Sequence, residues 1–372
     1  MTVYSKKKEK NKPDYVLICI IFLLVIFGII MLTSAGAPVG YERFGDSYYY
    51  LKHQVIYGLI PGIIVCLIMS KIKYTFWKKF AVLMLFVSIV LLTIVFIPGI
   101  GSEYGTAKSW INIGGLSLQP SEIVKLTFLI YLATWLEKRG QKNISDFFYG
   151  FLPFIFLLGL VTVLMLLQPD MGTMLIIVAE ILIVYFIAGG AISHLLLLGS
   201  GGLALLYFLI KLAPYRAARL TIFMHPELDP KGIGYHINQA FLAIGSGGIW
   251  GRGYGHSRQK FQYLPEVIGD SIFAIIAEEM GFIICIIVII LFVLLFIRGL
   301  KIAKQVPDMY GKLIVVGIIS WFLIQAFVNI GGMVGLLPLT GVPLPFISAG
   351  GTSLLVSLAA VGLVINISKH AR

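Results

Sequence analysis

Residues 271–297 read SIFAIIAEEMGFIICIIVIILFVLLFI, an apolar run whose only charged residues are Glu278 and Glu279. A helix of about 20 apolar residues crosses the roughly 30 Å of hydrocarbon in a bilayer. The rest of the chain has the same character, since 59% of its 372 residues are hydrophobic and 12% are charged. An ordinary soluble domain carries about 25% charged residues. Because this inventory cannot cover a water-facing surface, the sequence predicts a protein embedded in lipid.

Comparable apolar runs recur along the chain and predict its fold. Backbone groups that face hydrocarbon must be paired within a helix or a closed barrel, and these runs lack the alternation of barrel strands. We therefore predict an all-α polytopic membrane protein with about ten transmembrane helices. The predicted spans are residues 15–34, 54–70, 80–97, 119–136, 151–167, 173–188, 192–212, 271–297, 313–331 and 350–368.

The Lys and Arg residues predict the orientation of these helices. Basic clusters lie in the N-terminal tail, in every second loop and at the C-terminus, which places these segments in the cytoplasm. Residues 1–14 and 369–372 are then cytoplasmic tails. Residues 15–368 form a single transmembrane domain with one large extracytoplasmic loop, residues 213–270, between the seventh and eighth helices. Since the cytoplasmic tails and loops hold most of the basic residues, the net charge of +12 gives no reason to expect nucleic-acid binding.

The large outer loop is rich in basic residues and glycines, although outer loops normally carry few Lys and Arg. Two interpretations remain open. Long loops escape the charge rule, so this one could be merely solvated; alternatively, its backbone N–H groups and cations could bind an anionic ligand. The loop's three histidines have spacings unlike those of a zinc site, so we expect ordinary polar residues. The residues concerned are Arg216, Arg219, Lys231, Arg252, Arg258, Lys260, His225, His236 and His256.

Asp270 ends this loop at the start of the eighth span. Its carboxylate could be no more than an N-cap, or it could do chemistry at the membrane boundary. Deeper in the same helix, Glu278 and Glu279 are functional candidates because ionisable groups are costly there. At about 100° per residue, Glu278 lies about 80° from Asp270 around the helix, and Glu279 lies on the opposite side.

Other polar residues at membrane depth are further candidates. Glu122 and Lys125 are three residues apart on one helix face, where they could form an intrahelical ion pair or part of a site. Gln325 and Asn329 are four apart and could bond a neighbouring helix or line a cavity. Glu180 lies in the middle of a span, and the sequence assigns it no role.

Residues 337–353, LPLTGVPLPFISAGGTS, cannot form a regular helix because prolines and glycines interrupt the hydrogen-bond ladder. Irregular backbone at membrane depth is tolerated only where protein buries it or where it lines a cavity. We therefore expect this segment to shape a site. The chain shows no phosphate-binding loop, zinc-ligand spacing or Ser-His-Asp order, so ATP hydrolysis by this chain is not expected.

Several short motifs combine into a recognisable pattern. They are WINIG at 110–114, QPSE at 119–122 with Lys125, QPDMGT at 168–173, PYR at 214–216 with Arg219, GSGG at 245–248, YLPE at 263–266 and PLPFIS at 343–348. From about residue 15 to 368 the chain resembles the SEDS proteins (shape, elongation, division and sporulation), the FtsW/RodA family of bacterial cell-wall polymerases. The run GYGHSRQK at 253–260 is more similar to the division-type FtsW than to the elongation-type RodA.

This resemblance implies a glycosyltransferase that joins lipid II into glycan strands for septal cell-wall synthesis and releases undecaprenyl pyrophosphate. The family's essential aspartate falls on Asp270, which would be the general base for the acceptor hydroxyl. Arg216, Arg219 and Lys260 would stabilise the leaving pyrophosphate. No cofactor is certain; a divalent cation, Mg or Mn, is the one candidate, and its ligands are unknown. Further expected substrate-binding residues are Lys108, Trp110, Gln119, Glu122, Lys125, Asp170, Gln239, Glu266, Glu278 and Ser348.

The resemblance also implies partners and a location. The partners are lipid II, nascent lipid-linked glycan, a class B penicillin-binding protein (an FtsI-like transpeptidase), other divisome proteins and membrane lipid. The location is the bacterial plasma membrane at the division septum, with both termini in the cytoplasm. Three alternatives stay open: a lipid II flippase with Glu122, Lys125 and Glu278 along its path, an elongation-type polymerase, and a scaffold without turnover.

The sequence departs from the family pattern beside the aspartate. Gly269 and Ser271 stand where Thr and Phe are often found, which could alter how the carboxylate of Asp270 is held. Within the outer loop, His236 replaces a common Gln. Ser109 stands where a basic residue usually precedes the tryptophan, with a lysine one position earlier.

Overall fold

The computed structural model describes residues 12–104, 107–113, 116–212, 221–229 and 231–371. In these ranges seven helices are long and apolar enough to cross a membrane, which confirms the prediction of a multi-pass helical protein. They are Tyr15–Phe44 (α1), Tyr49–Lys71 (α2, Tyr49–Gln54; η1, Val55–Leu59; α3, Ile60–Lys71), Tyr74–Ile94 (η2, Tyr74–Phe80; α4, Ala81–Ile94), Phe147–Leu167 (η3, Phe147–Phe151; α6, Leu152–Leu167), Ile272–Gln305 (α11), Met309–Met333 (α12) and Gly351–Ser368 (α13).

Three more helices lie where the remaining spans were predicted. They are α5 (Pro120–Ile144), α7 (Met171–Ile187) and α8 (Ile192–Leu212). None of the three is among the seven helices above. Helix α5 carries several charged residues. Helix α7 is short, and so is the apolar part of α8. The count of ten transmembrane helices therefore stays a prediction.

The region between α4 and α5 corrects the purely helical prediction. It forms a three-stranded antiparallel sheet from β1 (Gly101–Tyr104), β2 (Ala107–Ile113) and β3 (Leu116–Leu118), in the order β1-β2-β3. The large outer loop also contains regular structure, η4 (Pro226–Leu228) and α10 (Ile233–Gly247). Such short elements depend on pairing and packing with the rest of the fold, because an isolated hairpin or helix of this length is marginal in water.

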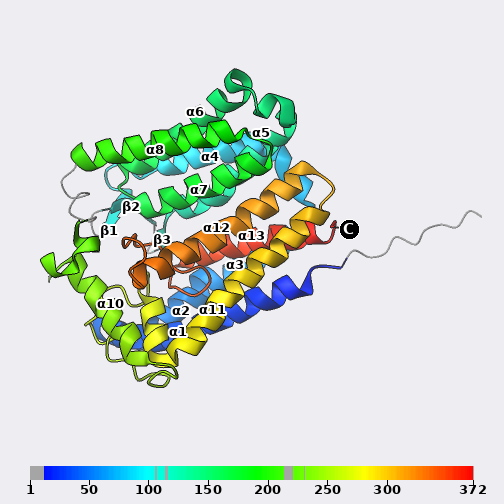
Figure 1. Ribbon diagram of the computed structural model, residues 1–372. Coiled ribbons are helices and arrows are strands. Elements are labelled where there is room, and N and C mark those ends of the chain that lie inside the picture. Colours follow the sequence, from blue (N-terminus) through cyan, green and yellow to red (C-terminus); the bar gives the residue numbers. More distant parts are fainter. Residues whose placement is uncertain (1–11, 105–106, 114–115, 213–220, 230, 372) are drawn as a thin grey trace, which may run out of the picture.

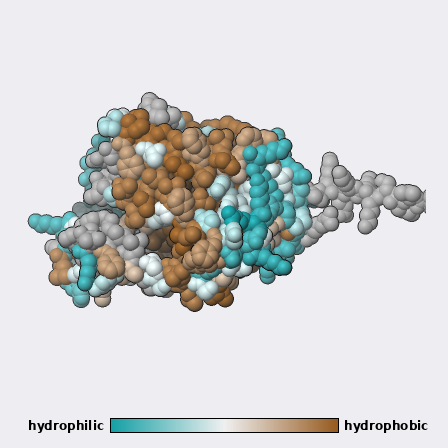
Figure 2. Space-filling model, turned by 90° about the horizontal axis from the view of Figure 1, so that it is seen from above, coloured by the Kyte–Doolittle hydropathy of each residue, from teal (hydrophilic) through white to brown (hydrophobic). Residues whose placement is uncertain are grey.

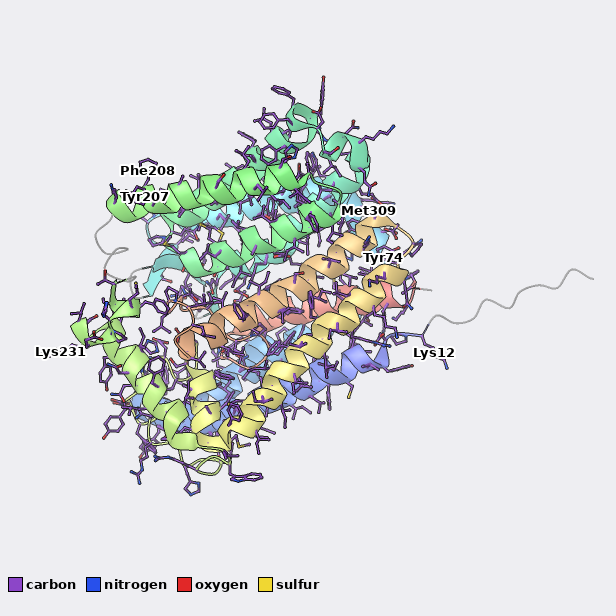
Figure 3. The ribbon with its side chains drawn as sticks, viewed as in Figure 1. Lys12, Tyr74, Tyr207, Phe208, Lys231 and Met309 are labelled. Atoms are coloured by element: carbon purple, nitrogen blue, oxygen red, sulfur yellow. The ribbon has the colours of Figure 1, made fainter. Side chains whose placement is uncertain are left out.

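The helices lie side by side in a bundle, with α12 and α13 near its middle (Figure 1). The two ends of the described chain lie at one end of the bundle, and α10 lies at the other (Figure 1). Lys12 and Lys231 accordingly mark opposite ends (Figure 3). This placement agrees with an even number of spans, whereas the side that faces the cytoplasm stays a prediction.

The outer surface of the bundle is apolar. Phe22, Val82, Phe156 and Phe282 are each at least 60% exposed, and hydrophobic residues cover much of the face shown in Figure 2, with hydrophilic residues gathered towards its ends. Since lipid tails are as apolar as these side chains, close packing and buried hydrogen bonds hold the helices together. Gly28 of α1 illustrates the packing, because a Cβ there would lie 2.4 Å from the carbonyl oxygen of Phe346.

Helix α11 is broken at Gly281, although the sequence predicted one continuous span. Gly281 has φ 77° and ψ −180°, and a Cβ at this position would lie 2.3 Å from the nitrogen of Gly251. The outer loop fills the break: the N–H of Arg252 donates to the carbonyl of Glu278, and the N–H of Phe282 donates back to the loop, both at 2.9 Å. The loop is therefore built into the membrane domain at this point.

Candidate active site

Asp270 lies directly before α11 and is only 9% exposed. Ser271, not Asp270, is the N-cap residue of α11, and no side chain caps the first turn. The interpretation of Asp270 as an N-cap is therefore wrong. Its carboxylate is not used to satisfy the helix terminus and remains available for chemistry.

The backbone around Asp270 is held by the C-terminal part of the chain. The side-chain amide of Asn329, on α12, donates to the carbonyl of Asp270 at 2.7 Å. The two preceding carbonyls are also bonded: that of Gly269 by the Ser348 hydroxyl at 2.6 Å, and that of Ile268 by the Ala349 N–H at 2.8 Å. Three consecutive carbonyls thus accept hydrogen bonds from α12 and from the Pro-rich segment, residues 337–353. These bonds fix the position of Asp270.

The environment of Asp270 favours its protonated form. Burial, and secondly the nearby negative charge of Glu266, raise the pKa of Asp270 to about 7. Hydrogen bonds from the Ser271 hydroxyl and from backbone N–H groups act in the opposite direction. A carboxyl group with a pKa near neutrality can accept and return a proton under physiological conditions.

The Pro-rich segment is irregular, as its sequence predicts, and residues 344–348 are buried. Its backbone is satisfied by side chains from other elements. The amides of Gln325 and Asn329 donate at 2.8 Å to the carbonyls of Pro343 and Val342. Within the segment Phe346 has φ 65°, an uncommon conformation for a bulky residue that persists only where the surroundings enforce it. The segment thus forms the wall against which Asp270 is positioned.

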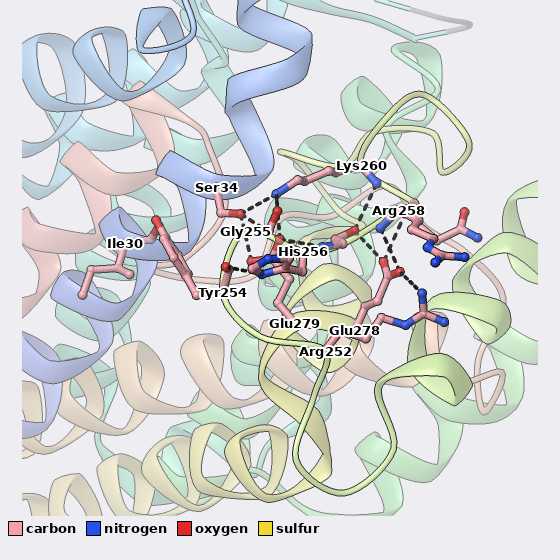
Figure 4. Close-up of polar contacts among 12 residues, drawn as sticks. Ile30, Ser34, Arg252, Tyr254, Gly255, His256, Arg258, Lys260, Glu278 and Glu279 are labelled. Carbon is pink, nitrogen blue, oxygen red and sulfur yellow. Dashed lines mark hydrogen bonds and ion pairs between the residues drawn. The ribbon is translucent and has the colours of Figure 1, made fainter.

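Glu278 holds the outer loop and does not contact Asp270 through any observed hydrogen bond. Its carboxylate accepts bonds from the Ser257 hydroxyl and from the N–H groups of Arg258 (3.0 Å) and Gln259 (3.3 Å). The guanidinium of Arg252 lies 4.0 Å away (Figure 4). Glu278 therefore anchors the loop, whereas the sequence had suggested a substrate contact.

Lys260 is buried in an ion pair with Glu279 (Figure 4). Its ammonium lies 2.9 Å from the Glu279 carboxylate, 2.9 Å from the hydroxyl of Ser34 and 2.7 Å from the carbonyl of Gly255. Ser34, on α1, also donates to Glu279 at 2.7 Å. In this arrangement Lys260 neutralises a buried carboxylate, and its side chain is 5% exposed.

A second buried polar cluster joins α5 to α12. Lys125 pairs with Glu122 at 2.8 Å, which is one of the two interpretations that the sequence left open. Its ammonium also donates to Gln325 at 2.8 Å and lies 4.6 Å from the ring centroid of Trp321. Glu180, on α7, is fully buried, and neither of its carboxylate oxygens has a hydrogen-bond partner among the described residues.

Asp170 caps α7 and connects it to α5. Its carboxylate accepts from the Thr173 N–H at 3.2 Å, from the amide of Gln119 at 3.2 Å and from the hydroxyl of Ser121 at 2.9 Å. The structure therefore brings together Asp170 and Gln119, two predicted substrate-binding residues from separate motifs.

Other predicted site residues are placed less fully. Arg216 and Arg219 lie outside the described residues, as does the side chain of Lys108. Trp110 lies on β2, opposite Ser102. Gln239 is partly buried on α10, and Glu266 is exposed on the loop before Asp270.

The described residues include no group of three metal-ligating side chains. Near Asp270 the second carboxylate is that of Glu266, which is close enough to raise the aspartate pKa. Two carboxylates suit a magnesium ion only when substrate phosphate oxygens and water complete its coordination. These two carboxylates alone do not form a metal site, and the described residues offer no ligand set for the expected divalent ion.

Sequence reasoning missed several residues that build this region. Ser34 completes the Lys260 cluster, and the side chain of Gln54 accepts from the N–H of Gly350 at 2.9 Å. Ser34 is a polar residue within an apolar span, and that is the signal by which it could have been found. Gln54 directly follows Lys52 and His53, so the sequence gave no comparable signal for it.

Fold and site together define a multi-pass helical membrane protein with a buried aspartic acid, Asp270, whose pKa is raised to about 7. Residues 14–372 match the FtsW/RodA/SpoVE family of cell cycle proteins. The chain belongs to this family, as its motifs indicated.

Named relatives match over almost their whole length. Stage V sporulation protein E of Bacillus subtilis is 41% identical over 364 residues, covering 98% of this chain and 99% of the relative. A probable peptidoglycan glycosyltransferase FtsW of Trichlorobacter lovleyi is 41% identical over 370 residues, covering 99% and 96%.

Solved structures show the same fold. A chain from a peptidoglycan synthase complex that coordinates polymerization and crosslinking aligns with a TM-score of 0.79 at 28% identity, covering 96% of this chain and 97% of that one. The rod shape determining protein RodA of Thermus thermophilus aligns with a TM-score of 0.70 at 27% identity, covering 96% of both chains.

Proposed function

We propose that this protein is a peptidoglycan glycosyltransferase that polymerises lipid II, with Asp270 as its general base. Relatives named as probable peptidoglycan glycosyltransferases, similar over nearly the full chain, support the reaction class. The observation that carries the role of Asp270 is a buried carboxyl with a pKa of about 7, whose backbone is fixed by Asn329 and Ser348.

The chemistry needs such a group. A sugar hydroxyl is a weak nucleophile because its pKa lies far above neutrality, so a positioned base assists its attack on the anomeric carbon of the donor. The new glycosidic C–O bond forms as the bond to the pyrophosphate oxygen breaks. The hydroxyl proton passes to Asp270, and undecaprenyl pyrophosphate leaves. Because the pKa of Asp270 is near 7, the group is largely ionised slightly above neutral pH and is still basic.

The leaving pyrophosphate develops negative charge that cations must stabilise. Lys260 is engaged with Glu279, so the proposal assigns this role to Arg216 and Arg219. A divalent ion that binds with the substrate would supply further positive charge.

We assign the protein to septal synthesis with a class B penicillin-binding protein as its partner, together with other divisome proteins. The FtsW names of its relatives support the septum, and the fold shared with a peptidoglycan synthase complex supports the partner. The equally similar sporulation relative makes location a necessary test. A tagged copy should gather at division sites in growing cells, and exclusive appearance in sporulating cells would reject the septal role.

Purified protein with labelled lipid II tests the reaction. Glycan ladders should form with the wild type and disappear with Asp270→Asn, while Ser246→Ala, which removes a hydroxyl bonded to a carbonyl of its own helix α10, should leave them intact. Ladders that persist in Asp270→Asn would reject the general base. Lipid translocation across vesicles without polymer would instead support a flippase, for which the buried Glu122–Lys125 pair is the favouring feature.

A further inference from the structure

The side chain of Asp270 is connected to helix α10 through Ser271 and His236. The hydroxyl of Ser271 lies 3.4 Å from one carboxylate oxygen of Asp270. The same hydroxyl lies 2.6 Å from Nε2 of His236, on α10. Thus Asp270, Ser271 and His236 form a continuous line of polar contacts.

The directions of these hydrogen bonds follow from the protonation of the histidine. Burial lowers the pKa of His236 to about 4, so the imidazole is neutral at physiological pH and carries one N–H. If Nε2–H donates to the Ser271 oxygen, the single hydroxyl proton of Ser271 is directed to the Asp270 carboxylate. The opposite tautomer would turn the hydroxyl proton away from the acid.

We propose that Ser271 and His236 are positioning residues that orient the Asp270 carboxylate and stabilise its ionised form. The inference rests on the proposed function, because it concerns the base of that reaction. Neither residue touches the substrate in this scheme. Ser271 supplies the hydrogen bond to the carboxylate, and His236 determines the direction in which the serine hydroxyl points.

The charged groups around Asp270 make the effect of the Ser271 hydroxyl on its pKa measurable. Glu266 raises the pKa of Asp270, while the Ser271 hydroxyl lowers it. Neutral His236 faces the serine from α10, and the groups that contact the site from α12 and the Pro-rich segment are the uncharged Asn329 and Ser348. Removing Glu266 and removing the Ser271 hydroxyl should therefore shift the titration of Asp270 in opposite directions.

The test is the pH dependence of kcat for polymerisation by the purified full-length protein. Activity should rise with pH through the pKa of Asp270. A hydrogen bond to the charged form of an acid stabilises that form and lowers the pKa of the acid. At 3.4 Å the Ser271 contact is long, so Ser271→Ala should move this rise upward by about half a unit to one unit. Glu266→Gln should move it downward.

Conservative variants separate positioning from general damage. Ser271→Thr keeps a hydroxyl and should restore the wild-type profile. His236→Gln keeps a donor and should do the same, whereas His236→Leu should behave like Ser271→Ala. Ser246→Ala, on the same helix as His236, removes an unrelated hydroxyl and should leave the profile unchanged. The thermal midpoint of each variant shows whether it is folded.

Different results would reject the proposed function and the positioning role of Ser271 and His236. If the wild type makes no polymer, or if Asp270→Asn retains activity, the proposed function is rejected. If Asp270 is essential but folded Ser271→Ala and His236→Leu both keep the wild-type profile, only the positioning role is overturned. If Ser271→Ala does not fold, the His236→Leu and His236→Gln pair decides the question.

Discussion

Variants of the buried pair Lys260 and Glu279 can show whether Lys260 stabilises the fold or binds the substrate. Glu279 is fully buried, and its carboxylate lies 2.9 Å from the Lys260 ammonium. Replacing only Lys260 by Met, or only Glu279 by Gln, removes one partner and leaves the other buried. The double variant Lys260→Met with Glu279→Gln removes both charges and keeps the volume similar.

The expected magnitudes follow from desolvation. Removal of one partner of a buried ion pair costs about 3–5 kcal/mol, because an uncompensated charge remains in a low-dielectric site. Replacement of both partners by neutral groups is often close to neutral. Each single variant should therefore be clearly destabilised, and the double variant should be more stable than either. Lys52→Met provides a matched control, since its pair with Asp46 is as short, 2.6 Å, but lies in solvent and should have no measurable effect.

The assay is thermal unfolding of the detergent-purified variants, followed by polymerisation of labelled lipid II. A double variant less stable than both singles would refute the reasoning, because the two charges would then not compensate each other. Polymerisation by the stable double variant decides the role of Lys260. Retained activity assigns the lysine to the fold, while loss of activity in a folded protein assigns it to the leaving group.

The remaining predictions concern the acid and two buried polar residues. Since the folded pKa of Asp270, about 7, lies above its ordinary 3.8, its effect on stability is most favourable below pH 4 and is lost as pH rises through 7, by at most about 4 kcal/mol. Asp270→Asn should therefore raise the thermal midpoint relative to wild type by clearly more at pH 8 than at pH 5; equal differences at both pH values would contradict burial of the carboxylate. Asn329→Ala removes donors to two buried carbonyls and should lower stability by about 1–3 kcal/mol per stranded group and polymerisation more than tenfold. Ser320→Ala on the same helix, whose buried hydroxyl has no partner among the described residues, should change neither. Glu180→Met replaces a carboxyl that has no hydrogen-bond partner in the described part of the chain by an apolar side chain of similar length, and should maintain or raise the thermal midpoint; a lower midpoint would show that Glu180 is paired.

Local patterns were sufficient to predict most of the helices and the irregular segment at residues 337–353. The helices α1, α11 and α12 coincide with apolar runs, and the Pro-rich segment is irregular as predicted, because hydropathy and proline or glycine content act over short stretches of chain. The Glu122–Lys125 pair was one of two interpretations that the sequence offered, because three-residue spacing on a helix is itself a spatial contact. The small sheet was missed, since strands this short are stabilised by their neighbours.

By itself, the sequence determined that this protein lies in lipid, where most of its helices run, and that Asp270 stands at a helix start. Only the tertiary structure decided which partner each buried polar group has. Lys260 meets Ser34 across 226 positions of sequence, and Asn329 reaches the Asp270 carbonyl across 59. Hydropathy records the free-energy cost of placing a polar group in the membrane. The group that offsets this cost comes from any helix that the packing brings close, and spacing along the chain does not specify that helix.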